Sequence, residues 1–170
     1  WLNLVLELPN KYLIYDYMDH HEGFGNVPEE LIKREKCILN KSDAVIVTSH
    51  FLEKIAFHHN KNVSLIRNGA NFDFFSKRPE KFFKDKKNRK IIGYYGAIAE
   101  WFDIDLVSEI AKNCPNDLVI LIGRDTVDAY KTFERYSNII MLGEIEFKNL
   151  TYYLYAFDVC ILPFKIIDLT

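Results

Sequence analysis

IIGYYGAIAEWFDIDLVSEIAKNCPNDLVILI, the stretch from Ile91 to Ile122, decides the fold class. It opens with an apolar and aromatic run, Ile91–Tyr95, that is followed by glycine, and it closes with a second apolar run, Leu118–Ile122. Short uninterrupted runs of this kind are typical of strands buried on both faces of a parallel sheet. Between them, one helical face collects the apolar residues Ile104, Val107, Ile110, Ala111 and Cys114. The stretch therefore predicts a strand–helix–strand unit with a right-handed crossover.

The same alternation of strand and helix continues outward in both directions. Further strands are predicted at residues 12–18, 44–47, 63–66, 139–142 and 159–162. Further helices are predicted at residues 28–40, 50–56, 127–136 and 146–157. Ser49 has a side chain suited to N-cap the second of these helices. We therefore expect an α/β fold, with Rossmann-like parallel sheets and flanking helices.

Residues 76–90 interrupt the alternation. They contain eight Lys or Arg side chains against Glu80 and Asp85, few aliphatic residues, and Pro79. This composition predicts a basic linker between two partial domains, residues 1–75 and 91–170. Because the chain starts at Trp1 without a methionine and stops at Thr170 just after a strand-like run, we also expect it to be an excerpt of a longer protein.

Composition narrows the class of protein further. The 170 residues are 49% hydrophobic and 27% charged, as in a folded protein, and the net charge of −2 argues against a general nucleic-acid clamp. Three cysteines without CxxC spacing indicate reduced thiols and a cytoplasmic location. The longest apolar runs are far shorter than the ~20 residues that span a bilayer. The linker lysines are read as a solvated segment, with peripheral contact to an anionic membrane as the alternative.

Ligands of parallel sheets bind beyond the carboxyl ends of the strands, so the residues that follow each strand are the site candidates. After the first strand come Asp19 and His20, beside His21 and Glu22. They are candidates for a base with its orienting partner, for metal ligands, or for a plain polar loop. Because adjacent side chains diverge, at most one of the two histidines should face a cleft.

Three later strands end in glycine turns. Gly96 would let the backbone approach a ligand closely, and the helix that starts after Asp103 offers an N-terminus to a diphosphate. Arg124, which follows Gly123, could pair with a phosphate or with Asp125. Backbone groups after Gly143 could read a nucleotide base. The GxGxxG fingerprint of dinucleotide cofactors is not present in the sequence.

Several motifs occur in a familiar order. KSDAVIVTS at residues 41–49 is followed by IRNGANFDFF at residues 66–75, and the glycine strand at residues 91–96 comes next. Residues 138–163 then carry Leu142-Gly143, Phe157-Asp158 and Leu162-Pro163 in phase. This series resembles the GT-B glycosyltransferases of group 1 (family 4-like), from the end of the first Rossmann-like domain into the second. The resemblance covers nearly the whole chain from about Tyr12.

The resemblance implies transfer of a sugar from a nucleotide-diphosphate-sugar donor to a glycan or lipid-linked acceptor, as in cell-surface polysaccharide synthesis. The acceptor would bind the first domain and the donor the second, with retention of configuration and with no cofactor, metal or nucleic acid. Asp19 and His20 would be catalytic, in a region where many relatives have a histidine at the position of Met18. The donor would contact the residues Gly96, Gly123, Arg124, Glu144 and Ile145.

The chain departs from the family pattern in two respects. Residues 97–104 supply no Lys or Arg where the family has a basic pair, and the acidic E-x7-E motif would lie beyond Thr170. Two alternatives therefore stay open beside a transferase. One is a non-catalytic module that binds a nucleotide or a partner, and the other is a GT-B-like nucleotide-sugar epimerase.

Overall fold

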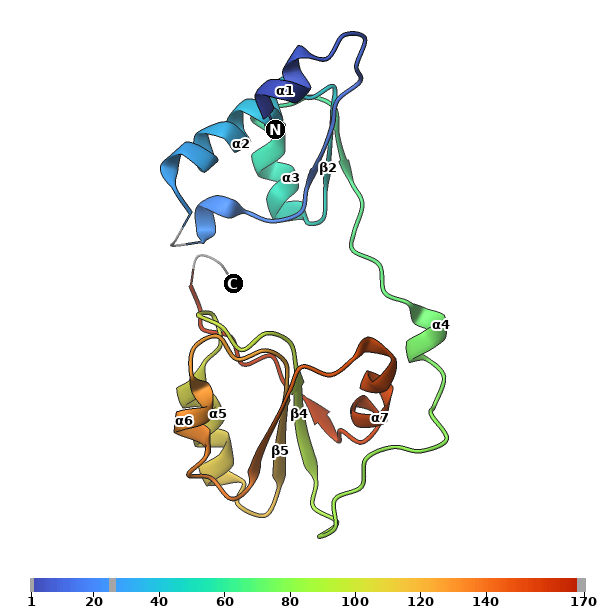
Figure 1. Cartoon of the computed structure of the whole chain (residues 1–170), viewed down its shortest axis with the longest axis vertical. Coiled ribbons are helices and arrows are strands. Elements are labelled where there is room, and N and C mark those ends of the chain that lie inside the picture. Colours follow the sequence, from blue (N-terminus) through green and yellow to red (C-terminus); the bar gives the residue numbers. More distant parts are fainter. Residues whose placement is uncertain (1, 25–26, 168–170) are drawn as a thin grey trace. The chain divides into compact units, whose positions relative to one another are not determined.

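The computed structural model describes residues 2–24 and 27–167, and Figure 1 shows the course of the chain. The described residues up to Ala70 form one compact unit, and those from Asn71 onward form a second. Trp1 and residues 168–170, the outer ends of the two predicted domains, lie outside the described residues. Each unit has its own parallel sheet and its own apolar core.

The first unit is a three-stranded parallel sheet in the order β1-β2-β3. Its elements are α1 (Leu2–Glu7), β1 (Ile14–Tyr17), the 3-10 turn η1 (His21–Gly23), α2 (Glu29–Lys41), β2 (Ala44–Val47), α3 (His50–Phe57) and β3 (Val63–Leu65). The core consists of Tyr17, Leu39, Val45, Val47, Leu52 and Ala56. As predicted, Ser49 caps α3, because its hydroxyl accepts the N–H of Leu52 at 3.2 Å.

The second unit is a four-stranded parallel sheet in the order β6-β5-β4-β7. Its elements are α4 (Phe72–Phe75), β4 (Ile91–Tyr95), α5 (Ile104–Asn113), β5 (Leu118–Ile122), α6 (Ala129–Phe133), β6 (Ile139–Gly143), the 3-10 turn η2 (Phe147–Asn149), α7 (Leu150–Leu154) and β7 (Val159–Cys160). All five residues of β5 are buried. The two sheets confirm the predicted α/β class with flanking helices.

The helix predicted at residues 146–157 is shorter in the structure, where η2 is followed by the five-residue α7. In a continuing α-helix the carbonyl of Tyr152 would accept the N–H of Ala156. Here it accepts the N–H of Phe83 at 2.8 Å, and the N–H of Ala156 donates to Tyr153 instead. A long-range hydrogen bond from residues 76–90 thus lies at the point where the α-helical pattern stops.

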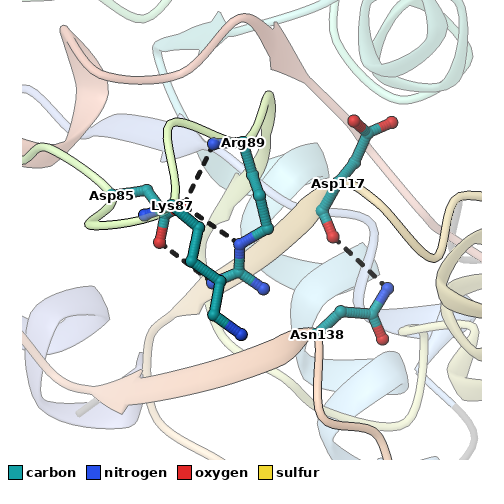
Figure 2. Close-up of polar contacts among 5 residues, drawn as sticks. All are labelled: Asp85, Lys87, Arg89, Asp117 and Asn138. Carbon is teal, nitrogen blue, oxygen red and sulfur yellow. Dashed lines mark hydrogen bonds and ion pairs between the residues drawn. The ribbon is translucent and has the colours of Figure 1, made fainter.

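Asn138 connects the end of α5 to the start of the central strand. The side-chain amide, which is buried, donates to the carbonyls of Ala111, Cys114 and Asp117 at 3.0, 3.1 and 3.3 Å. Figure 2 shows the contact with Asp117. The carbonyls of Ala111 and Cys114 lie at the C-terminal end of α5, and that of Asp117 directly precedes β5, so one amide joins the helix terminus to the start of the strand.

Residues 76–90, expected from the sequence to be a linker, pack on the second unit. The ring of Phe83 stacks on Tyr153 with centroids 5.8 Å apart. The carboxylate of Asp85 accepts the N–H groups of Lys87 and Arg89 at 3.1 and 3.0 Å, and it pairs with the guanidinium of Arg89 at 2.9 Å (Figure 2). This largely buried ion pair closes a turn just before β4.

We expect Asp85→Asn to destabilise the second unit at neutral pH. Hydrogen bonds from Arg89 hold the pKa of Asp85 well below its ordinary value of 3.8. A lowered pKa in the folded state stabilises the fold above the ordinary value, and this stabilisation is lost as the pH falls towards the folded-state pKa. Urea unfolding should therefore show a gap between wild type and variant that is largest near pH 7 and shrinks from about pH 4 to about pH 2.

Asp73→Asn serves as the control, since Asp73 is exposed on α4 and has no ion pair among the described residues. A gap for Asp85→Asn that does not change with pH would contradict the role assigned to this carboxylate.

Candidate functional site

A hollow of about 250 Å³ lies at the carboxyl ends of three neighbouring strands of the second unit. Its lining residues are Tyr95, Gly96, Ala97, Gly123, Arg124, Glu144 and Ile145. The structure thus brings together all five residues predicted to contact the donor. Tyr95 and Ala97 also line the hollow but were not among the predicted donor contacts. Their positions on either side of Gly96 could have identified both. Tyr95 is also a half-exposed aromatic residue at the end of a buried strand.

Main-chain hydrogen bonds build the floor of this hollow by continuing the sheet past its strands. The N–H of Gly96 donates to Ile122 at 2.9 Å, and the N–H of Gly123 donates to Gly143 at 2.8 Å. Farther along, the N–H of Ile98 donates to the carbonyl of Arg124 at 2.8 Å. Because the amides of both glycines are already paired, their contribution to a ligand site is the absence of a side chain.

Glycine is required at position 123 by a close approach of two backbones. Gly123 has φ of 143°, and a Cβ added there would lie 1.8 Å from the carbonyl oxygen of Gly96. No rotamer relieves such a clash, since both atoms belong to the backbone or are fixed to it. The loops after β4 and β5 can therefore meet only if residue 123 lacks a side chain.

We expect Gly123→Ala to lower the free energy of unfolding by about 3 kcal/mol, because the backbone must shift or adopt a strained conformation. Gly69→Ala is the matched control, since nothing lies within 4 Å of a Cβ at that position. Urea denaturation followed by circular dichroism measures both. Equal stability of the two variants would contradict the close approach.

Neither charged side chain that lines the hollow forms an ion pair among the described residues. Arg124 and Glu144 are exposed. Asp125 accepts the N–H groups of Val127 and Tyr130, each at 3.0 Å. Burial raises the pKa of Asp125, but the backbone N–H groups outweigh that effect and the net pKa lies below the ordinary value. Arg124 and Asp125 form no ion pair among the described residues. Asp125 binds backbone N–H groups instead of the Arg124 guanidinium.

The N-terminus of α5 is occupied by its own cap. A carboxylate oxygen of Asp103 accepts the N–H of Leu106 at 2.9 Å. A fixed negative charge at this point uses one of the N–H groups on which an anion would depend and repels a phosphate. The residues that line the hollow do not include this helix start. The N-terminus predicted to suit a diphosphate is therefore not part of the hollow.

The candidate residues of the first unit follow β1. Asp19 is exposed. Nδ1 of His20 lies 3.2 Å from the hydroxyl of Tyr17, and its ring meets Phe51 edge-on with centroids 5.3 Å apart. Burial first, and then the charge of Glu35, raise the pKa of Tyr17 to about 12. The hydroxyl therefore stays protonated at neutral pH and can donate to Nδ1, and this contact holds the orientation of the ring.

The neighbouring His21 has a different partner. Its Nδ1 contacts the buried carboxylate of Glu35 on α2. The hydroxyl of Tyr15 donates to the same carboxylate oxygen at 3.3 Å. The two adjacent histidines thus have different partners, Tyr17 for His20 and Glu35 for His21. Because Glu35 attaches η1 to α2, it also holds the loop that carries Asp19 and His20.

Three further features bear on a metal site, on disulfides and on a membrane span. Within residues 2–24 and 27–167, no group of His, Cys, Asp or Glu side chains is arranged to hold a metal ion. The three cysteines Cys37, Cys114 and Cys160 are free thiols. None of the helices in the described part of the chain has the length and apolar character needed to cross a bilayer.

One curated protein with significant similarity is a glycosyltransferase. The chain is 22% identical over 138 residues to the putative teichuronic acid biosynthesis glycosyltransferase TuaH of Bacillus subtilis. The match covers 75% of this chain and 35% of that protein. No protein-family model matches the chain.

Solved structures share the fold. Sucrose-phosphate synthase of Thermosynechococcus elongatus matches with a TM-score of 0.74 and 20% identity, over 96% of this chain and 48% of that one. HepE of Anabaena, solved in complex with UDP and glucose, matches with a TM-score of 0.66 and 14% identity, over 86% of this chain and 45% of that one. The predicted GT-B type is thereby confirmed at the level of the fold, and the chain spans about half of these structures and about a third of the curated relative.

Proposed function

We propose that this chain belongs to a glycosyltransferase that moves a sugar from a nucleotide-diphosphate-sugar donor to a glycan or lipid-linked acceptor, in cell-surface polysaccharide synthesis. The second unit binds the donor, and the first unit contributes acceptor-side groups. The transfer retains the anomeric configuration. The protein works in the cytoplasm, in peripheral contact with the inner face of the membrane.

The observation that carries this proposal is the hollow at the carboxyl ends of β4, β5 and β6. Five residues selected from the sequence as donor contacts line it together, in a fold shared with a protein solved with UDP and glucose. Open parallel sheets bind their ligands at this edge. As the nucleotide diphosphate leaves, negative charge grows on its phosphate oxygens, and the exposed guanidinium of Arg124 is placed to stabilise that charge.

Asp19 and His20 serve the acceptor in this proposal. Asp19 offers an exposed carboxylate to a sugar hydroxyl, and His20 presents Nε2 while Nδ1 is held by Tyr17. A histidine with one nitrogen fixed by a hydrogen bond keeps its ring orientation and tautomer. Such a pair can orient the acceptor hydroxyl and exchange a proton with it.

We expect Arg124→Ala to weaken the binding of UDP at least about tenfold, because a charge-assisted contact to phosphate contributes about 1.5–3 kcal/mol. Calorimetry on the full-length protein should show a much smaller effect on uridine, which lacks the phosphates. Arg135→Ala is the control, since Arg135 precedes β6 and lies at the opposite end of that strand from Glu144. An absence of binding to UDP, GDP and their sugars by the wild type would refute the transferase proposal.

We expect Asp19→Asn and His20→Ala to lower the rate of sugar transfer about 100-fold while UDP affinity stays within twofold. The assay follows release of the nucleoside diphosphate from its sugar by the full-length protein, with His58→Ala, just after the C-terminal end of α3, as the control. Normal turnover in both variants would reject these two residues but not the transferase. Binding of UDP-glucose with neither transfer nor hydrolysis would favour a binding module, and conversion to an epimeric sugar would favour the epimerase.

A further inference from the structure

Residues 76–90, called here the basic segment, give the chain a strong charge asymmetry. The segment has eight basic and two acidic side chains, a net charge of +6, in a chain whose net charge is −2. The other 155 residues therefore carry a net charge of −8. Such a separation of charge directs one face of a protein towards anionic surfaces.

Most of this positive charge is not neutralised within the second unit. Arg89 pairs with Asp85, and Lys90 pairs with Asp158 at 2.8 Å. The remaining basic side chains are exposed and have no ion pair among the described residues: Lys77, Arg78, Lys81, Lys84, Lys86 and Lys87. Six uncompensated cations are therefore available to an external partner.

The basic segment is attached to the folded unit at several points. The N–H of Phe83 donates to the carbonyl of Tyr152, and the carbonyl of Lys90 accepts the N–H of Leu118, each at 2.8 Å. Just before the segment, the hydroxyl of Tyr155 donates to the carbonyl of Phe75 at 2.9 Å. The turn closed by Asp85 fixes its far end. Since the backbone of the segment is already ordered, binding of a partner to these cations costs less conformational entropy than binding to a free tail would.

Aromatic side chains accompany the cations. Phe82 lies between Arg78 and Lys84, whose charged groups are 5.0 and 5.6 Å from the centre of its ring. Next to the segment, Phe72 on α4 is 76% exposed and Phe147 on η2 is 52% exposed. Exposed aromatic rings beside lysine and arginine suit the boundary between lipid headgroups and acyl chains. Because the ring of Phe82 is engaged by cations, stacking on a nucleic-acid base is the less favoured reading.

We propose that the basic segment, with Phe72 and Phe147, is a docking surface for the headgroups of anionic phospholipids. This surface deepens the peripheral membrane contact proposed above, and it depends on the charge and exposure of these residues rather than on sugar transfer. Docking by this surface would hold the second unit at the membrane without a spanning helix.

The test is sedimentation of the full-length protein with vesicles of phosphatidylcholine alone or with about 30% phosphatidylglycerol. We expect binding to the anionic vesicles only, and a steep decrease with added salt. Replacing Lys77, Lys81 and Lys86 by alanine together should lower the partition coefficient about 100-fold, at about fivefold for each lysine near the surface. Phe147→Ala should give a smaller loss at all salt concentrations, because it removes apolar contact and no charge.

The matched control replaces Lys41, Lys54 and Lys61 of the first unit, which are exposed and change the net charge by the same amount. It should bind vesicles within twofold of the wild type. Equal losses in the two triple variants, or no vesicle binding by the wild type, would overturn the proposal. Binding of single-stranded RNA that depends on Lys77, Lys81 and Lys86, without vesicle binding, would assign the surface to nucleic acid. UDP affinity in the triple variant reports separately on the donor site.

Discussion

Hydrogen bonding between parallel strands continues beyond the ends of β4 and β5, and the candidate hollow depends on it. The amides of Gly96 and Gly123 each donate to the last residue of the neighbouring strand, so three strand ends are joined. β5 is buried over its whole length, and the backbone groups that leave it must find partners near a dry core. The sheet therefore fixes where Arg124 and Glu144 leave the strand ends and line the hollow.

Some of the fold could be predicted to the residue. The bounds of β2, β4 and β5 were predicted correctly, because each is an apolar run with polar or turn residues on both sides. The convergence of the donor residues also followed from the sequence, since parallel strands end at one edge of a sheet. The helices α1 and α4 were not predicted, because six and four residues are too few to show a helical period.

The basic segment shows what local composition cannot reveal. Its lysines and lack of aliphatic residues are typical of a linker, and they remain exposed as that pattern suggests. Its attachment comes from Phe83, which meets Tyr152 and Tyr153 about seventy residues later in the chain. The N–H of the same residue donates to the carbonyl of Tyr152, at the point where α7 ends.

Positive charge in the second unit serves two separate places. Among the residues that line the hollow, Arg124 is the cation and Glu144 the anion. Lys90, at the end of the basic segment, precedes β4 and lies about 20 Å from Gly96 at ~3.3 Å per residue. This exceeds twice the Debye length of ~8 Å at physiological ionic strength, so an exposed charge there contributes little to the hollow. A diphosphate in the hollow must therefore draw on Arg124 and other groups at the carboxyl edge, while the unpaired lysines that precede Lys90 stay available to a partner of the basic segment.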